Sequence, residues 1–223
     1  MTDEKKGKIV IISGFSGAGK GTVVNKLMET FDNYKLSVSM TTRKPRKNEE
    51  HGVNYYFVTN EEFEKNIRED GFLEYARYGD HYYGTPKGFV VDNLAAGNNV
   101  ILEIEVQGAE QIMKMYPDTI SIFLAAPTAM ELQHRLVNRG SESHAEITKR
   151  LMTGIREAEK MRYYDYVLIN RDLDRCVSEL DRIVRADTKD HKYDPSFKER
   201  FVKDLEEIVE KRVREHQEGH LTD

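Results

Sequence analysis

The residues with the clearest chemical use lie in the segment Gly14 to Lys20, which reads GFSGAGK and fits the spacing G-x-x-x-x-G-K. The segment follows an apolar run, IVIIS, and precedes a helical pattern, which is the context that this motif requires. Glycines there allow consecutive backbone N–H groups to turn inward and line a nest for phosphate oxygens. Lys20 adds a positive charge for the outer phosphates. The segment therefore predicts a nucleotide phosphate site rather than an ordinary glycine-rich turn with a surface lysine.

The hydroxyl residues beside this lysine depart from the usual pattern. The Ser or Thr that normally follows the lysine is Gly21 here, and Thr22 comes one position later. Because that hydroxyl normally ligates Mg²⁺, direct ligation is less secure in this chain. We expect the hydroxyls of Ser16 and Thr22 to act on a metal only through water.

A second group of cations follows in the segment SVSMTTRKPR. Arg43 and Arg46 stand three residues apart beside a proline, and two guanidinium groups at that spacing can bind one phosphate bidentately. Tyr55 in GVNYYFV and Tyr83 in HYYGT offer hydroxyl donors in the same part of the chain. The alternatives are a solvated basic turn and the aromatic packing of a small β lobe. A phosphate site apart from the glycine segment suggests two phosphorylated substrates that meet.

Three carboxylates occupy positions where strands are expected. Glu74 alternates with aromatic residues in FLEYARY, so it lies either at a site or on a solvated face. Glu103 and Glu105 are two residues apart near the carboxyl end of an expected strand, so they should share one side of it. Open α/β sheets bind ligands at that end. Because buried acids are rarely structural without a partner, we expect both residues to serve a site.

Arginines also gather further along the chain. Arg135 and Arg139 are four residues apart and therefore share a helix face. The polar stretch RGSESH follows, in which Ser143 and Glu146 predict a capping box for a helix that carries Arg150. The alternative is a salt-bridged surface helix, which is common in a chain this charged.

The elements that must position these residues follow from the apolar pattern. Four β-rich runs predict strands at 8–13, 99–106, 119–126 and 165–170, and helical patterns lie at 20–30, 107–115, 128–138, 145–163 and 172–185. Continuous apolar strands that alternate with helices predict a parallel sheet covered on both faces. Between residues 36 and 84 the runs are short, aromatic and alternating, with one helical piece near 60–69. That texture predicts a small β-rich lobe inserted into an α/β body.

The chain after Ala186 is strongly charged and predicts one last amphipathic helix. Asp194–Pro195 supplies a cap and a first helical position, with a capping box from Ser196 and Glu199 as the alternative. We expect the apolar stripe of this helix to pack on the body of the same chain or, as the alternative, on a second copy. Either way, we expect the helix to stabilise rather than to catalyse. The stripe consists of Phe197, Phe201, Leu205 and Ile208.

Composition limits the classes of function. The chain has 223 residues, of which 33% are charged, and a net charge of −5, which argues against a general nucleic-acid or membrane-surface binder. No apolar run approaches the roughly 18 residues that a membrane span needs, and the first residues lack the pattern of a signal peptide. The single cysteine, Cys176, shares the spacing of a helical apolar stripe and is expected in the core. A reduced, cytoplasmic protein is therefore expected.

In order and spacing, these segments resemble the guanylate kinase family from about residue 8 to residue 186. The resemblance rests on GFSGAGKGT, SVSMTTRKPR, HGVNYYFV, FLEYARYGDHYYGT, LEIEVQG and RLVNRGSESHAEITKR. It implies an α/β fold with a P-loop NTPase core, in which helices flank a parallel five-stranded sheet, together with a β-rich GMP-binding lobe and a helical lid. The implied activity is ATP + GMP → ADP + GDP with Mg²⁺, in purine nucleotide metabolism. The implied layout is a single domain over 1–223, with the core at 8–35 and 88–186, the GMP-binding lobe at 36–87, the lid at 139–150 and a C-terminal extension at 187–223.

The resemblance assigns the acceptor nucleotide to the lobe and to the strand at 99–106. A carboxylate accepts hydrogen bonds from both donors on the edge of guanine. With adenine, the lone pair of N1 would face the carboxylate and no hydrogen bond could form there. Relatives often carry serine where this chain has Thr85 and aspartate where it has Glu105, so the reach of Glu105 differs by one methylene. The implied residues are Arg43, Arg46, Tyr55 and Tyr83 for the GMP phosphate, Ser39 and Thr85 for guanine O6, and Glu74 and Glu105 for guanine N1–H and N2–H₂.

The donor nucleotide belongs to the glycine segment. Because the acceptor is an anionic phosphate oxygen, no general base is needed, and positioning, Mg²⁺ and cations relieve the repulsion between two polyanions. We assign Glu103 to a water bound to Mg²⁺ and Asn170 to the adenine pocket. The ATP-binding set is Gly14, Phe15, Ser16, Gly17, Ala18, Gly19, Lys20, Gly21, Thr22 and Asn170, and the catalytic set is Lys20, Arg43, Arg135, Arg139 and Arg150.

Two other functions remain as alternatives. A kinase of related fold that acts on a ribose bisphosphate-type substrate would keep the glycine segment but would not need the guanine-reading residues. A non-catalytic guanylate-kinase-like scaffold would typically lack an intact phosphate loop or arginine set, both of which are present here. We therefore expect ATP and GMP as partners, dGMP as a further acceptor, no nucleic-acid polymer, no membrane, and a monomer or homodimer.

Overall fold

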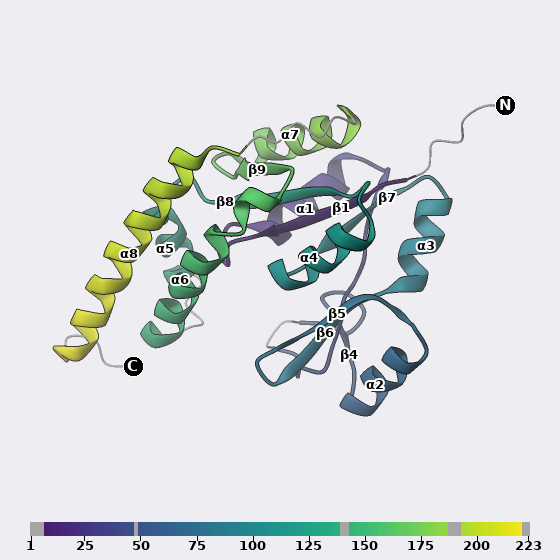
Figure 1. The fold of residues 1–223 in the computed structure, drawn as a ribbon, viewed down its shortest axis with the longest axis horizontal. Helices are drawn as coiled ribbons and strands as arrows, with labels where there is room; N and C mark the ends of the chain where they lie inside the picture. The colour runs from purple at the N-terminus through teal and green to yellow at the C-terminus, as the bar shows by residue number, and fades with distance from the viewer. Residues whose placement is uncertain (1–6, 47–48, 139–142, 187–192, 220–223) are drawn as a thin grey trace. The chain divides into compact units, whose positions relative to one another are not determined.

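The computed structural model describes residues 7–46, 49–138, 143–186 and 193–219. Its main sheet has five strands in the order β2-β7-β1-β8-β9 (Figure 1). The strands are β1 (Ile9–Gly14), β2 (Tyr34–Leu36), β7 (Asn99–Glu103), β8 (Ile120–Ala125) and β9 (Tyr166–Ile169). The pairs β1–β7, β2–β7 and β8–β9 are parallel. Every residue of β1 and β8 is buried, as expected for central strands covered on both faces.

Helices connect and flank these strands, which confirms the predicted α/β architecture. The predicted helix at 145–163 is shorter, since α6 ends at Ala158 and a short 3₁₀ helix, η1 (Met161–Tyr163), follows. The helices around the main sheet are α1 (Lys20–Thr30), α3 (Lys87–Ala95), α4 (Val106–Met115), α5 (Ala129–Val137), α6 (His144–Ala158), α7 (Leu173–Ala186) and α8 (Pro195–Gln217).

A second, four-stranded sheet is built from the segment with the aromatic alternation. Its order is β4-β3-β6-β5, with β3 (Met40–Thr41), β4 (Tyr56–Phe57), β5 (Phe72–Tyr78) and β6 (His81–Pro86). Helix α2 (Asn60–Arg68) belongs to the same segment and begins with a capping box between Thr59 and Glu62. Phe63 of α2 stacks on Phe72 of β5, with ring centroids 4.4 Å apart, so aromatic packing holds this sheet to its helix.

By its internal contacts the chain forms two compact units. The first unit comprises Met1–Ile12 and Leu27–Ser121, and the second comprises Ser13–Lys26 and Ile122–Asp223. The small sheet, α2, α3 and α4 therefore belong to the first unit. The glycine segment, α5, α6, α7 and α8 belong to the second unit.

The carboxyl end of β7 differs from the prediction. The strand stops at Glu103, and Glu105 is the N-cap residue of α4, so the two carboxylates do not share one strand face. The chain leaves the sheet here because a helical pattern of buried residues, Val106, Ala109 and Ile112, begins at once. Glu105 is exposed and Glu103 half-buried, so the expectation that both acids are buried was wrong.

The C-terminal helix is packed within its own unit. Helix α8 runs beside α6 and also contacts α5 (Figure 1). Asp194 caps it, and its side chain accepts a hydrogen bond from the Ser196 N–H, so the alternative capping box is not used. Its buried stripe is Phe201, Leu205, Val209 and Arg212, with Phe197 and Ile208 half-buried.

Two smaller expectations can also be compared with the structure. Cys176 is buried on α7, and burial raises the pKa of its thiol to about 12, which fits a core residue that stays protonated. Within the described ranges, no helix is both long enough and apolar enough to span a bilayer.

Candidate functional site: two nucleotide half-sites

The phosphate loop of the second unit is shaped by glycines where the chain leaves β1. Gly14, Gly17 and Gly19 all have positive φ, at 143°, 92° and 94°. A Cβ on Gly14 would lie 2.1 Å from the carbonyl oxygen of Leu124, so the loop could not pass β8 with any other residue there. The loop leads directly into α1, which begins at Lys20. This is the strand, loop and helix arrangement that places phosphate at a helix N-terminus.

Hydrogen bonds within the loop fix its conformation. The Phe15 N–H donates to the Leu124 carbonyl at 3.2 Å, and the Ala18 N–H donates to the Phe15 carbonyl at 3.0 Å. The Lys20 ammonium donates to the Gly14 carbonyl at 2.8 Å, so the half-buried cation lies against the loop it would serve. The ring of Phe15 is fully buried, which leaves only its backbone available to a nucleotide.

Two predicted arginines reach the loop from separate helices. Arg135 of α5 donates to the carbonyls of Ala18 at 3.2 Å and Asn170 at 3.0 Å. The buried side-chain amide of Asn170 donates to the same Ala18 carbonyl at 2.9 Å. Arg150 of α6 donates to the Ser16 hydroxyl at 2.7 Å. The structure thus gathers Arg135, Arg150 and Asn170 around one loop.

The remaining residues of the donor set are placed differently. Thr22 is exposed on α1, one position beyond Gly21, in the first turn of the helix. Arg139 lies outside the described residues. The capping box of Ser143 and Glu146 that was expected to start α6 is present.

The first unit brings together the residues expected to hold the acceptor phosphate. Arg43 donates through two nitrogens to both carboxylate oxygens of Glu49, at 2.9 and 3.0 Å. Its guanidinium carbon lies 5.4 Å from the ring centre of Tyr55, which in turn lies 6.0 Å from the ring centre of Tyr83. Arg46 is exposed, and its backbone N–H donates to Glu49 at 2.7 Å.

Contacts and burial shift the pKa values of three residues in this cluster. Hydrogen bonding to Glu49 is the main cause that raises the pKa of Arg43, and the same bond lowers the pKa of the Glu49 carboxyl. Burial, with the charges of Glu103 and Glu105 nearby, raises the pKa of Tyr55 to about 12. Tyr55 therefore remains a phenol, and a hydrogen-bond donor, at any physiological pH.

The residues predicted to read guanine form a second cluster in the same unit. Glu74 is only 6% exposed, which excludes the solvated face, and the fully buried Thr85 hydroxyl donates to its carboxylate at 2.6 Å. The two residues face each other across β5 and β6. Ser39 directly precedes β3, in which Met40 faces Gly84 of β6. Burial raises the pKa of Glu74, and the bond from Thr85 opposes that rise.

Two residues of the site had not been predicted. Glu49 follows Arg46 by three positions, but a carboxylate beside an anion site gives no pattern of its own. Gly108 of α4 faces Glu74, since a Cβ there would lie 2.7 Å from the Glu74 carboxylate oxygen. A glycine inside a helical pattern was the available signal for a close approach.

Comparisons with known proteins agree with this geometry. The family model described as guanylate kinase matches residues 6–187. The chain belongs to the guanylate kinase family. It is 46% identical over 187 residues to the guanylate kinase of Caldanaerobacter subterraneus subsp. tengcongensis, a match that covers 84% of this chain and 91% of the relative. It is 43% identical over 202 residues to that of Clostridioides difficile, covering 90% and 98%.

A solved guanylate kinase supports the fold. The crystal structure from Anaplasma phagocytophilum is 34% identical, with a TM-score of 0.66, and the match covers 82% of this chain and 86% of that one. Membership in the guanylate kinase family makes this chain an ATP-dependent GMP kinase. Helix α8, which begins at Pro195, lies beyond the residues that the guanylate kinase model matches.

Proposed function

We propose that this enzyme transfers the γ-phosphoryl group of ATP in line to the phosphate of GMP or dGMP, with Mg²⁺. The observation that carries the proposal is the Glu74 carboxylate, buried beside Thr85 in the unit that also holds Arg43, Tyr55 and Tyr83. A buried carboxylate with one hydroxyl partner has acceptor capacity left over for a ligand that offers donors. Guanine offers such donors at N1–H and N2–H₂.

On the acceptor side, base and phosphate have separate binding groups. Thr85 has one hydroxyl hydrogen, which it gives to Glu74, so we assign it to orienting the carboxylate and leave guanine O6 to Ser39. Glu105, exposed at the start of α4, is a second acceptor for the guanine donors. We assign Arg43, Arg46, Tyr55 and Tyr83 to the phosphate. None of these groups is assigned to the sugar, which is why dGMP is included.

On the donor side, we assign the triphosphate to the backbone of residues 14–22 and to Lys20. Arg135 and Arg150 contact this loop, and we assign both to the charge that develops on the transferring group. The side chain of Asn170 bonds to the loop at the Ala18 carbonyl, and we assign this residue to adenine. Arg139 stays in the proposed catalytic set.

The residues present fit Mg²⁺ held mainly by substrate phosphates. The cation prefers oxygen ligands and keeps several waters, so one carboxylate acting through water is enough. Glu103, half-buried at the end of β7, is the carboxylate that we assign, and Ser16 and Thr22 supply hydroxyls. In the described part of the chain, no group of three or more His, Cys, Asp or Glu forms a protein cage for a metal. When bound, the ion would neutralise charge on the transferring phosphates.

The chemistry then depends on positioning and charge. The attacking oxygen of GMP is already anionic, so the chain needs no residue to remove a proton. Its cations lower the repulsion between the two nucleotides, and they favour the transition state by lying where negative charge spreads over the phosphoryl oxygens.

The deciding experiment is a panel of nucleoside monophosphates with ATP and Mg²⁺, in which ADP formation is measured. GMP should exceed AMP, CMP and UMP by a large factor, about 10⁴ in kcat/KM, because AMP leaves the buried acceptors unpaired. Comparable turnover of all four would contradict the assignment of Glu74 and Glu105 to the base. Replacing GMP by dGMP should change kcat/KM by less than about tenfold, since no assigned group contacts the 2′-hydroxyl.

A further inference from the structure

Helix α8 contacts the phosphate loop directly. The ring of Phe201 stacks on the ring of Phe15, with centroids 4.8 Å apart and planes 4° apart. Phe15 also meets Phe123 of β8 edge-on, with ring centroids 4.9 Å apart. Phe15 is fully buried and Phe201 is 2% exposed. The one large apolar side chain of the loop therefore packs against both β8 of the main sheet and α8.

This packing of Phe15 matters because the glycines of the loop cannot fix its conformation through side-chain contacts. Glycines contribute no side-chain packing and leave the backbone free to change conformation. The backbone of Phe15, in contrast, bonds to Leu124 and Ala18, and its carbonyl also lies 3.4 Å from the Lys20 ammonium. A shift of the Phe15 ring would therefore move the groups that shape the phosphate nest.

The same helix also holds α6. Arg212, 7% exposed, donates to the Thr148 hydroxyl at 3.0 Å and to the His144 carbonyl at 3.2 Å, both in the first turns of α6. Near the other end of α6, Lys198 pairs with Glu159 at 2.8 Å. Helix α6 carries Arg150, which bonds to Ser16 of the loop. Helix α8 thus reaches the loop through Phe201 and again through α6.

Close packing connects these two contacts. A Cβ on Gly154 of α6 would lie 3.6 Å from the Phe15 ring and 3.7 Å from Leu205 of α8, so glycine brings both within ordinary contact of the α6 backbone. The loop, α6 and α8 therefore pack together around the Phe15 ring.

We propose that α8 positions the phosphate loop and α6 for ATP, with Phe201 as the positioning residue. This rests on the proposed binding of ATP by that loop. The role belongs to a helix that lies beyond the region that the family model matches. It goes further than a general stabilising role, because it makes ATP affinity depend on an aromatic ring of α8.

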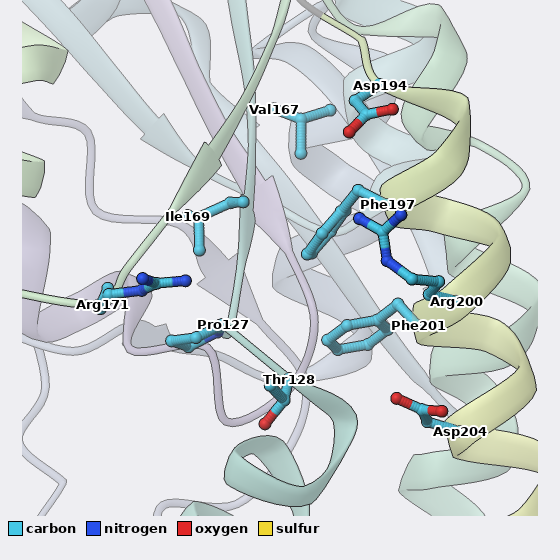
Figure 2. A pocket seen from close by; sticks show the side chains of 10 residues that line it. All are labelled: Pro127, Thr128, Val167, Ile169, Arg171, Asp194, Phe197, Arg200, Phe201 and Asp204. Carbon is cyan, nitrogen blue, oxygen red and sulfur yellow. The ribbon is translucent and has the colours of Figure 1, made fainter.

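The surroundings of Phe201 make the test sharp. Phe201 and Phe197 line a hollow of about 340 Å³ between α8, Ile169 of β9 and the start of α5 at Pro127 and Thr128 (Figure 2). Space is already open on that side, so a truncated residue 201 would join the hollow instead of being refilled by neighbours. The Phe15 ring would then lose its stacking partner, and the loop would lose its aromatic contact with α8.

The experiment compares Phe201→Ala with Val209→Ala, a buried apolar residue two turns further along the same helix. Dissociation constants for ATP alone and for GMP alone are measured by calorimetry, with melting temperatures as the stability record. For Phe201→Ala, we expect the ATP constant to rise roughly tenfold or more, by analogy with the loss caused by small misplacements, and the GMP constant to stay within about twofold. Val209→Ala should lower the melting temperature and leave both constants unchanged. Phe201→Leu keeps part of the contact and should recover part of the ATP affinity. It replaces Phe201→Ala in the comparison if the alanine variant does not fold.

Three results would overturn the proposal: a folded Phe201 variant with the ATP affinity of the parent, equal losses for both nucleotides, or the same loss of ATP affinity in Val209→Ala. Failure of the parent to phosphorylate GMP would instead overturn the proposed function. The two failures are distinguishable because ATP binding is measured without GMP.

Discussion

At the scale of single residues, Glu74 carries the most specific chemistry. A carboxyl group whose pKa is raised by burial is stabilised in its protonated form, and protonation replaces an acceptor site with a donor. Because its pKa is raised in the folded state, this carboxyl group stabilises the fold at low pH. That contribution is lost as the pH rises through the folded pKa. The role proposed for Glu74 at guanine requires the opposite state, the ionised carboxylate.

We therefore expect GMP affinity to fall on acidification earlier than an ordinary glutamate would allow. The KM for GMP should rise as the pH drops from neutral, with a midpoint above 4.5, the usual value for this side chain, whereas the KM for ATP should not follow that titration. Glu74→Gln should bind GMP roughly 10–100-fold more weakly and lose this dependence. The phosphate of GMP, which itself titrates near pH 6, is unchanged in the variant and serves as the internal control. An identical pH profile in parent and variant would contradict the role of Glu74.

For Gly108→Ala we expect a more stable helix α4 but weaker binding of GMP. Gly108→Ala should favour helix α4 intrinsically by about 1 kcal/mol, but its Cβ would meet the Glu74 carboxylate at 2.7 Å. Because the carboxylate must move, we expect the KM for GMP to rise about tenfold or more with the KM for ATP unchanged. Gly88→Ala in α3, where an added Cβ meets nothing within 4 Å, is the matched control and should leave both KM values alone. A GMP affinity equal to that of the parent would mean that Glu74 can shift without cost.

Residue types at fixed spacing were enough to predict Lys20 and its loop, because G-x-x-x-x-G-K between a strand and a helix has a mechanism of its own. The burial of Glu74 could not be predicted, since alternation in FLEYARY fits either face of a strand. Its partner Thr85 is brought to it by the pairing of β5 and β6. Glu49 was missed for a similar reason: its role depends on a turn that brings it back to Arg43.

At the scale of elements, the prediction worked where hydrophobic periodicity was long and its ends were marked. Helix α1 has the predicted bounds, and α5, predicted at 128–138, runs from Ala129 to Val137. Strand β2 was missed because three residues, Tyr34–Leu36, are too few to show a period. Helix α3 was missed because it buries only Val90 and contains Gly88 and a pair of valines, a weak helical pattern.

The placement of α6 makes Arg150 the element-scale test of catalysis. Its guanidinium reaches Ser16 of the phosphate loop, where charge should develop during transfer. Arg150→Ala is expected to lower kcat by about 10²-fold or more with a smaller effect on the KM for GMP. Arg156→Ala, six residues along the same helix and exposed, should keep the activity of the parent. Equal kcat values for the two variants would show that Arg150 only supports the loop.

At the scale of the whole molecule, each compact unit holds one half of the proposed chemistry. The residues assigned to GMP, from Ser39 to Glu105, all belong to the first unit. The loop, Arg135, Arg150 and Asn170 all belong to the second. The order along the chain does not show this division, because residues 27–121 of the first unit lie between the loop and the arginines that contact it.

This division predicts that ground-state binding of the two nucleotides separates by unit. Arg43→Ala removes a charged partner of the acceptor phosphate, so it should weaken GMP binding roughly 10–100-fold and leave the ATP constant within about twofold. Lys20→Met should leave GMP binding unchanged and lower kcat by about 10²–10³, because its charge acts on the donor phosphates. Lys149→Met, an exposed lysine beside Arg150, is the control for loss of charge alone. For binding of each nucleotide alone, the double variant Arg43→Ala with Lys20→Met should show the sum of the single effects in free energy, as expected for independent sites. Arg43→Ala weakening ATP as much as GMP would mean that the units do not bind their nucleotides independently.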